Sequence, residues 1–282
     1  MTHQYTNLRD IADALQLAAS ATGDHDQLRL TMETDSRVID EWLGYEVGPR
    51  DTTRYFTAVE SMQLRLDRPL LSITALRTDS SGNGSYGTTM STAHFYLTPY
   101  NAPTESPPQP FWGIEVRATA TSVFPAKTRR GVEIAGRWGV YDQRDTSTAV
   151  LSTDANATTP TLEVTGASSL YSGQTIRVGT EDMFVVRSPV TATAAHTSQV
   201  TVQRAQNGTT GSTHSSATGI GVYTYPIVDR ACLFQVQHDF KFSKADPVAG
   251  GGGFGPIQPL PEGNLHPAVR QMLRGFRSPV VA

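Results

Sequence analysis

Residues 79–84 come closer to a metal-binding motif than any other stretch of this sequence. Asp79, Ser81 and Asn83 alternate, and Gly84 stands at the sixth position, which resembles the start of a calcium-binding loop. Such a loop needs a bidentate Glu at its twelfth position, where this chain has Met90, and the flanking residues have strand patterns. We therefore expect a tight hairpin turn carried by Asp79, Asn83 and Gly84, without calcium, because asparagine and glycine tolerate positive φ angles.

The other reactive side chains form no catalytic or metal-binding pattern. None of the seven histidines has a partner at the i, i+4 spacing of a helical zinc site, and no serine lies in a Gly-x-Ser-x-Gly elbow. Cys232 lies in an apolar helical stretch, which indicates a small core residue. The glycine run at 250–255 lacks the Gly-Lys-Ser/Thr ending of a phosphate loop and indicates a tether. We expect neither an enzyme nor a cofactor, although a site assembled from distant residues stays open.

Two groups of basic residues stand out: Lys127, Arg129 and Arg130, and Arg270, Arg274 and Arg277. The second group has spacings of four and three, which place it on one face of a helix. Such a face can simply be solvated. Alternatively, it can dock an acidic partner or line a channel that DNA passes through.

The bulk composition limits the class of protein. A chain of 282 residues forms one large domain or two small ones. Its net charge of −3 argues against a molecule whose whole surface binds nucleic acid. One cysteine cannot form an internal disulfide, which argues against a stapled secreted scaffold. No signal peptide and no apolar stretch long enough to span a bilayer are recognisable. We therefore expect that the protein is made in a cytoplasm and that it does not bind a membrane.

Helical patterns occur at both ends of the chain. Apolar residues at helical spacing predict helices over residues 6–22 and 24–43. Helical spacing returns at Pro226, and a last short helix begins near Pro267. Neither pair of helices has enough apolar surface to fold alone, so both must pack on something else.

The middle of the chain has strand patterns of two kinds. The first group comprises residues 54–57, 61–66, 70–76, 94–97, 114–117 and 131–139. The second group, rich in Thr, Ser, Ala and Gly, comprises residues 161–164, 175–178, 182–186 and 199–202. Regular short strands separated by glycine-containing turns are typical of a small barrel or sandwich.

These patterns predict an α+β fold with a small helical core of about four helices, a β-sheet region and an inserted all-β barrel or sandwich module. Residues 1–144 form the first part of the core, a helical hairpin followed by strands. Residues 145–222 are the inserted β-module. Residues 223–282 complete the core with a helix, the Gly-rich loop, a C-terminal helix and a tail.

The order of these pieces resembles the head–tail adaptor (connector) family of tailed bacteriophages. The stretches that carry the resemblance are residues 36–44, 53–56, 66–76, 79–84, 96–103 and 132–139, then the third helix, the Gly-rich loop and a final helix ending in Phe276-Arg277. Together they cover residues 6–141 and 226–278. The insert departs from the minimal family pattern, and its residues 173–186 and 204–210 look like a β-module of other phage structural proteins.

The resemblance implies a non-enzymatic structural protein of the virion, made in the host cytoplasm and placed in the neck, where head and tail meet. It would form a homo-oligomeric ring of about twelve subunits, a dodecamer, beneath the portal protein. Double-stranded DNA would pass through the lumen during ejection without base readout. A stopper or tail-completion protein would bind the far side. What the insert binds is open.

In this family the C-terminal segment often reaches up to the portal, so the resemblance implies that residues 263–282 bind it here. The apolar anchors would be Leu265, Val269, Leu273 and Phe276, and the charged ones Arg270, Arg274 and Arg277. Removing residues 263–282 is then expected to abolish portal attachment and to leave the fold intact.

The alternative is a virion surface or tail protein that binds carbohydrate or a host surface through the β-module. Exposed aromatic residues on the insert strands would favour it, but Tyr171, Phe184 and Tyr223 are few and far apart. Electron microscopy with the portal protein distinguishes the two: the adaptor forms a coaxial ring, whereas a binding module stays monomeric or trimeric and binds glycans.

Overall fold

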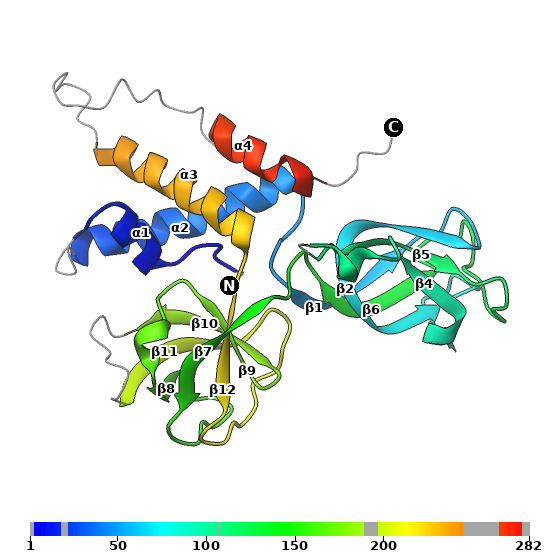
Figure 1. Cartoon of the computed structure of the whole chain (residues 1–282). Helices are drawn as coiled ribbons and strands as arrows, with labels where there is room; N and C mark the ends of the chain where they lie inside the picture. The colour runs from blue at the N-terminus through cyan, green and yellow to red at the C-terminus, as the bar shows by residue number, and fades with distance from the viewer. Residues whose placement is uncertain (1–2, 18–21, 107, 189–196, 245–264, 278–282) are drawn as a thin grey trace. The chain divides into compact units, whose positions relative to one another are not determined.

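The computed structural model (Figure 1) describes residues 3–17, 22–106, 108–188, 197–244 and 265–277. Over these residues the fold is α+β, with four α-helices, an open sheet and a closed six-stranded barrel. The chain divides into two compact units: the helix–barrel unit, Met1–Gly44 and Gln143–Ala282, and the sheet unit, Tyr45–Asp142. None of the described helices has the length and hydrophobicity that crossing a bilayer requires.

The helices begin and end where local chemistry dictates. They are α1 (Leu8–Ala14), α2 (Thr22–Leu43), α3 (Pro226–Lys244) and α4 (Pro267–Leu273), followed by the 3-10 turn η4 (Arg274–Phe276). Asn7 caps α1 by accepting a hydrogen bond from the Asp10 N–H. This helix is shorter than the predicted 6–22 because Gln16 has a φ of 57°, which no α-helix accommodates. The predicted starts of α3 and α4 at proline are confirmed.

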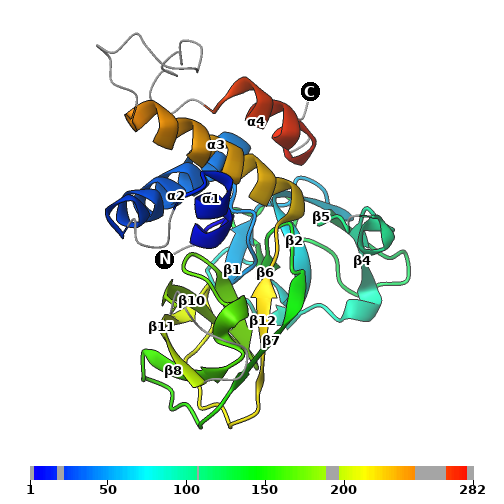
Figure 2. The same ribbon diagram turned by 60° about the vertical axis from the view of Figure 1, so that its left-hand side comes forward.

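The helices pack on one another through buried apolar faces. Met32 and Ile39 of α2 and Val236 of α3 are fully buried. Figure 2 shows α2 and α3 side by side, with α4 lying along α3. The helices also contact the barrel, since the Leu8 N–H donates to the Ser172 carbonyl at 3.0 Å. Contacts thus group the helices with the barrel, whereas the sequence analysis grouped them with the sheet.

The barrel is closed and antiparallel, in the order β10-β11-β8-β7-β12-β9. Its strands are β7 (Arg144–Leu151), β8 (Thr161–Thr165), β9 (Thr175–Val178), β10 (Glu181–Arg187), β11 (Thr197–Gln206) and β12 (Gly219–Tyr223), with the 3-10 turn η3 (Ala167–Ser169). Alternate side chains such as Leu162, Val164 and Ile176 fill the interior. Of the two predicted alternatives, the module is therefore a barrel. The strands that close the barrel, β7 and β12, were not predicted from the sequence.

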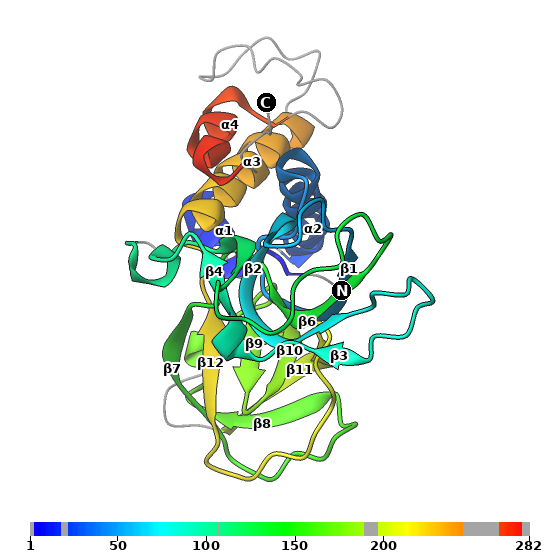
Figure 3. The ribbon, with the colours of Figure 1, turned by 90° about the vertical axis from the view of Figure 1, so that its right-hand side faces the viewer.

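The sheet unit holds one open sheet in the order β1-β6-β2-β5-β4, with β3 on β2. Its elements are β1 (Arg50–Phe56), β2 (Gln63–Thr78), β3 (Thr88–Thr89), η1 (Thr92–His94), β4 (Phe95–Thr98), η2 (Ala102–Thr104), β5 (Phe111–Val116) and β6 (Val132–Trp138). Leu64, Leu76, Ile114 and Ile134 belong to the core that covers one face. Figure 3 shows β1 and β4 at opposite edges of this sheet.

Candidate functional site

The structure divides the candidate portal-binding residues by exposure. Leu265, Val269 and Leu273 are buried, Phe276 is half-buried, and Arg270, Arg274 and Arg277 are exposed. The three buried side chains lie within the helix–barrel unit, whose α4 packs on α3. They are therefore not available to another protein unless α4 leaves α3. Removing residues 263–282 would also uncover apolar surface of the remaining helices, so we no longer expect that truncation to leave the fold intact.

Contacts at both of its ends fix α4 on the neighbouring helices. The His266 N–H donates to Gln235 Oε1 of α3 at 2.9 Å. The His266 ring caps the helix, because its Nδ1 accepts a hydrogen bond from the Ala268 N–H at 3.2 Å. Beyond the other end, the Arg277 guanidinium lies 5.0 Å from the centroid of the Trp42 ring. The outer side of α4 therefore keeps Arg270 and Arg274, one helical turn apart, at a defined place on the surface.

A buried aspartate of α2, Asp35, lies against the partly exposed Asp239 of α3, close to the start of α4. Asp35 is 4% exposed, shares a hydrogen bond with Asp239, and has one oxygen without a partner among the described residues. Burial first, and the neighbouring Asp239 second, raise the pKa of Asp35 to about 8. Asp239 in turn accepts hydrogen bonds from Gln235 Nε2 and from His238 Nδ1, both at 2.9 Å. The sequence gives one indication of this buried acid, because Asp35 interrupts the apolar face of the helix predicted over residues 24–43.

A second buried network centres on Glu181 of the barrel. Its carboxylate receives Arg204 through two contacts, Nε to Oε1 at 2.8 Å and Nη2 to Oε2 at 2.6 Å. His214 Nε2 lies 2.9 Å from Oε2, and the N–H groups of Ala205 and Ser212 also donate to the carboxylate. Glu181 is 0% exposed, so no solvent stabilises its charge. The arginine and the backbone N–H groups stabilise that charge instead. Nothing in the sequence singled this residue out.

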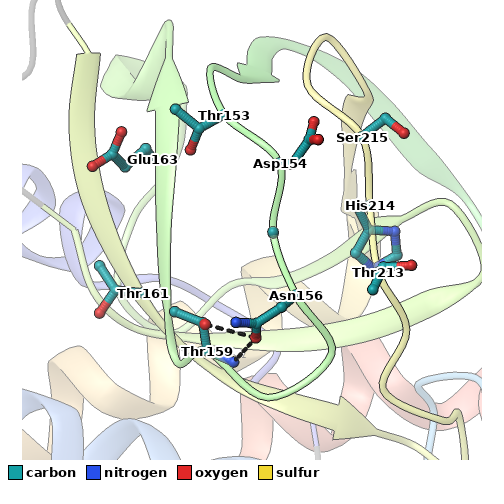
Figure 4. A pocket seen from close by; sticks show the side chains of 10 residues that line it. Thr153, Asp154, Asn156, Thr159, Thr161, Glu163, Thr213, His214 and Ser215 are labelled. Carbon is teal, nitrogen blue, oxygen red and sulfur yellow. Dashed lines mark hydrogen bonds between the residues drawn. The ribbon is translucent and has the colours of Figure 1, made fainter.

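The barrel surface has an open polar depression of about 500 Å³, shown in Figure 4. The side chains drawn there belong to Thr153, Asp154, Asn156, Thr159, Thr161, Glu163, Thr213, His214 and Ser215. Asn156 and Asp154 serve the loops, because Asn156 Oδ1 accepts from the Thr159 N–H and Asp154 Oδ1 accepts from the Ser216 N–H, each at 2.7 Å. Hydroxyl and carboxylate groups dominate the lining, which suits a ligand rich in hydroxyl groups.

None of the aromatic residues considered for ligand binding lines this depression. Phe184 and Tyr223 are buried, with exposed fractions of 6% and 5%. The Tyr171 hydroxyl donates to the Ser168 carbonyl at 2.7 Å. The depression therefore offers hydrogen bonds and lacks an aromatic stacking platform.

In the turn after β2, donors of the turn itself form hydrogen bonds to both carboxylate oxygens of Asp79. Its carboxylate accepts hydrogen bonds from the N–H groups of Ser81 at 3.0 Å, Gly82 at 2.9 Å and Gly84 at 2.7 Å, and from the Ser81 hydroxyl at 2.8 Å. The Ser81 hydroxyl is the main cause of the lowered pKa of Asp79, and the backbone donors add to it. Gly82 and Gly84 have positive φ angles, and Asn83 Oδ1 accepts from the Ser85 N–H. β2 and β3 pair antiparallel on either side of this turn.

Asp79→Ala is expected to lower the melting temperature of the sheet unit, because three backbone N–H groups of the turn lose their acceptor. Asp79→Asn keeps one acceptor oxygen, so its melting temperature should lie between those of the wild type and Asp79→Ala. Asn83→Ala removes one exposed hydrogen bond and is the control, so its melting temperature should change little. Thermal unfolding with and without calcium measures these differences. A rise in the wild-type melting temperature on adding calcium would contradict the hairpin interpretation.

The remaining reactive residues lie apart from one another. Across the described part of the chain, no three His, Cys, Asp or Glu side chains are grouped so that they could hold a metal ion. Cys232 is fully buried beside the Ser36 hydroxyl, and burial raises the pKa of its thiol. His196 and the glycine run at 250–255 lie outside the described residues.

Similarity to known proteins gives no further guide. Comparison of the chain with protein-family models, curated proteins and solved structures finds no match. The function must therefore be inferred from the residues and their geometry.

Proposed function

We propose that this chain is a non-enzymatic subunit of a ring-shaped head–tail adaptor of a tailed phage. The ring lies beneath the portal protein, lets double-stranded DNA pass, and receives a stopper or tail-completion protein on its far side. Two things support the proposal: the ordered motifs that resemble the adaptor family, and the way in which the C-terminal helix is held. The second observation carries the most weight.

The helix α4 combines a fixed apolar side with an exposed basic side. Val269 and Leu273 are fully buried, whereas Arg270 and Arg274 point away from that contact and are exposed. Because the helix is already ordered, a partner that binds the arginines does not have to order it first. Guanidinium groups pair well with carboxylates, so an acidic surface on the portal protein is the matching partner.

The test is a charge reversal on the exposed side of α4. Arg270→Glu/Arg274→Glu is expected to weaken binding to the cognate portal protein by about tenfold or more, and wild-type binding should weaken as salt is raised. Gln271→Glu, also exposed on α4, is the matched control for added negative charge. Binding assays with the purified portal protein, together with electron microscopy of the complex, give both affinity and ring geometry. Unchanged affinity of the double variant, or the absence of a coaxial ring, would refute the proposal.

A second candidate function rests on the polar depression of the barrel. Its hydroxyl and carboxylate lining suits a hydroxylated ligand such as a surface glycan. Glycan arrays with the wild type and with Thr161→Val test it. Glycan binding by a monomer or trimer that Thr161→Val abolishes would favour this function over the adaptor.

A further inference from the structure

The start of α4 is held by a histidine nitrogen that must carry no proton. His266 is the N-cap residue of this helix, and its Nδ1 accepts a hydrogen bond from the Ala268 N–H at 3.2 Å. A ring nitrogen that accepts a hydrogen bond has no hydrogen of its own, so the neutral ring carries its proton on Nε2. Protonation adds a hydrogen to Nδ1, which then points at the Ala268 N–H, donor against donor. The cap is therefore lost when His266 becomes charged.

A second histidine faces the first one across the contact between α3 and α4. The rings of His238 and His266 lie 5.1 Å apart, and the Phe234 ring lies 5.0 Å from that of His266. His238 Nδ1 lies 2.9 Å from Asp239 Oδ1, and both the neutral and the charged ring can donate this hydrogen bond. His238 therefore keeps its place on α3 when it gains a proton. Two charged rings at this distance repel each other across the contact.

Burial and the neighbouring histidine both favour the uncharged form of His266 in the docked helix. Burial is the larger cause of its lowered pKa, the charge of His238 is the second, and Asp239 acts against both. Once α4 leaves α3, the solvated ring regains the ordinary pKa of 6.5. Because the undocked helix binds the proton more readily, docking of α4 weakens as the pH falls below about 6.5.

The other charged groups around this ring do not gain or lose charge as the histidines do. Asp239 faces His266 from α3, and Asp35 of α2 lies behind Asp239. The pKa of Asp35 is about 8, so this acid already holds its proton at neutral pH and keeps it in acid. Arg270, one turn further along α4, stays charged at every pH. Histidine is the side chain that gains a proton in mildly acidic solution.

We propose that His238 and His266 form an acid-sensitive contact that docks α4 on α3 at neutral pH and releases it at mildly acidic pH. Release uncovers Val269 and Leu273, which are fully buried in the docked helix. A helix of seven residues is not stable away from its partner, so Arg270 loses its defined place on the surface. The contact rests on the proposed function only for its consequence, which is that acid weakens attachment to the portal protein.

Hydrogen exchange of the full chain tests the contact without any partner. The protection factors of the α4 amides, relative to those of α3, are expected to fall by about fivefold between pH 7 and pH 5. His266→Asn keeps a capping oxygen that does not titrate, so its α4 protection should not change over this range. A wild-type protection that is equal at both pH values, or a variant that loses protection as the wild type does, would overturn the proposal.

Two further variants show which histidine is responsible. His238→Asn keeps a donor for Asp239 and removes the second charge, so its α4 protection should fall with pH by less than that of the wild type. A fall as large as that of the wild type would overturn the pairing of the two rings. His94→Asn, in η1 of the sheet unit, is the matched control and should follow the wild type.

Portal binding separates this contact from the adaptor function. Wild-type affinity for the purified portal protein is expected to fall several-fold more between pH 7 and pH 5 than that of His266→Asn, because acidic groups of the portal titrate equally in both measurements. An α4 that loses protection in acid in a chain that never binds the portal would support the contact and refute the adaptor function. Portal binding with the same pH dependence in both proteins, together with unchanged α4 protection, would overturn the contact and leave the adaptor function standing.

Discussion

Glu181→Gln is expected to reduce the free energy of unfolding of the helix–barrel unit by about 3 to 5 kcal/mol. The carboxylate is fully buried, and the Arg204 side chain that it pairs with is 7% exposed. Without the negative charge, the guanidinium remains in the interior with only neutral acceptors, which are the amide oxygen of the new glutamine and the carbonyl oxygens of Asn156, Thr159 and Ser212. Urea unfolding at pH 7, followed by hydrogen exchange of the barrel amides, measures the loss.

Two further variants make this prediction specific. Glu163→Gln removes a half-exposed carboxylate of β8 that has no ion pair in the described residues, and it should change stability by less than about 0.5 kcal/mol. Glu181→Gln/Arg204→Met removes both buried charges and should be more stable than Glu181→Gln alone. If Glu181→Gln unfolded within about 1 kcal/mol of the wild type, the buried pair would not be a main support of the barrel.

The pH dependence of stability gives an independent check on Glu181. Burial by itself would raise its pKa, but hydrogen bonds from Arg204, Ser212, His214 and Ala205 outweigh burial and lower the pKa to about 2 from 4.5. Because the pKa is lower in the folded state, the stabilisation is complete above pH 4.5 and is lost as the pH falls toward 2. The wild type should lose up to about 3 kcal/mol over this range, and Glu181→Gln should lack that loss.

The sequence predicted those elements whose own chemistry determines them. Proline at the first helical position marked the starts of α3 and α4, and the strand over residues 175–178 was predicted at its observed bounds. The strands β7 and β12 were missed because β7 is mostly Thr, Ser and charged residues and β12 contains two glycines. Both are strands because they pair with each other and close the barrel, which is a tertiary effect that overrides local propensity.

For the candidate portal-binding site, the sequence predicted which residues are basic or apolar. It did not predict which residues they contact. Spacing placed Arg270, Arg274 and Arg277 on one helical face. Arg270 lies in α4 and Arg274 in η4, and both are exposed, whereas Arg277 follows η4 in extended backbone, so the prediction was wrong for Arg277. The resemblance implied that Leu265, Val269 and Leu273 are apolar anchors for the portal, whereas in the structure they are buried and α4 packs on the chain's own α3. That contact depends on packing between residues far apart in the sequence, which periodicity does not encode.

Asp35→Asn is expected to raise the free energy of unfolding at pH 9 by as much as about 5 kcal/mol. Asp35 is buried between α2 and α3 beside Asp239, and its pKa rises from 3.8 to about 8. Since the unfolded chain ionises first, wild-type stability falls from about pH 4 to about pH 8 and stays low above that range. An asparagine cannot ionise, and its amide can donate to Asp239 as the protonated acid does.

The stabilisation by Asp35→Asn must therefore grow with pH, and this distinguishes it from a general packing effect. Below about pH 4 the variant and the wild type should be equally stable, because the acid is protonated in both folded and unfolded chains. The neighbouring titratable groups Asp239, His238 and His266 remain in both proteins, so the difference between them reports Asp35 together with its coupling to Asp239. Asp26→Asn, at a side chain that is 77% exposed on the same helix, is the control and should show no such trend. Urea unfolding at pH 4, 7 and 9 decides the matter: an equal gain at all three values would mean that Asp35 does not keep its proton in the folded protein.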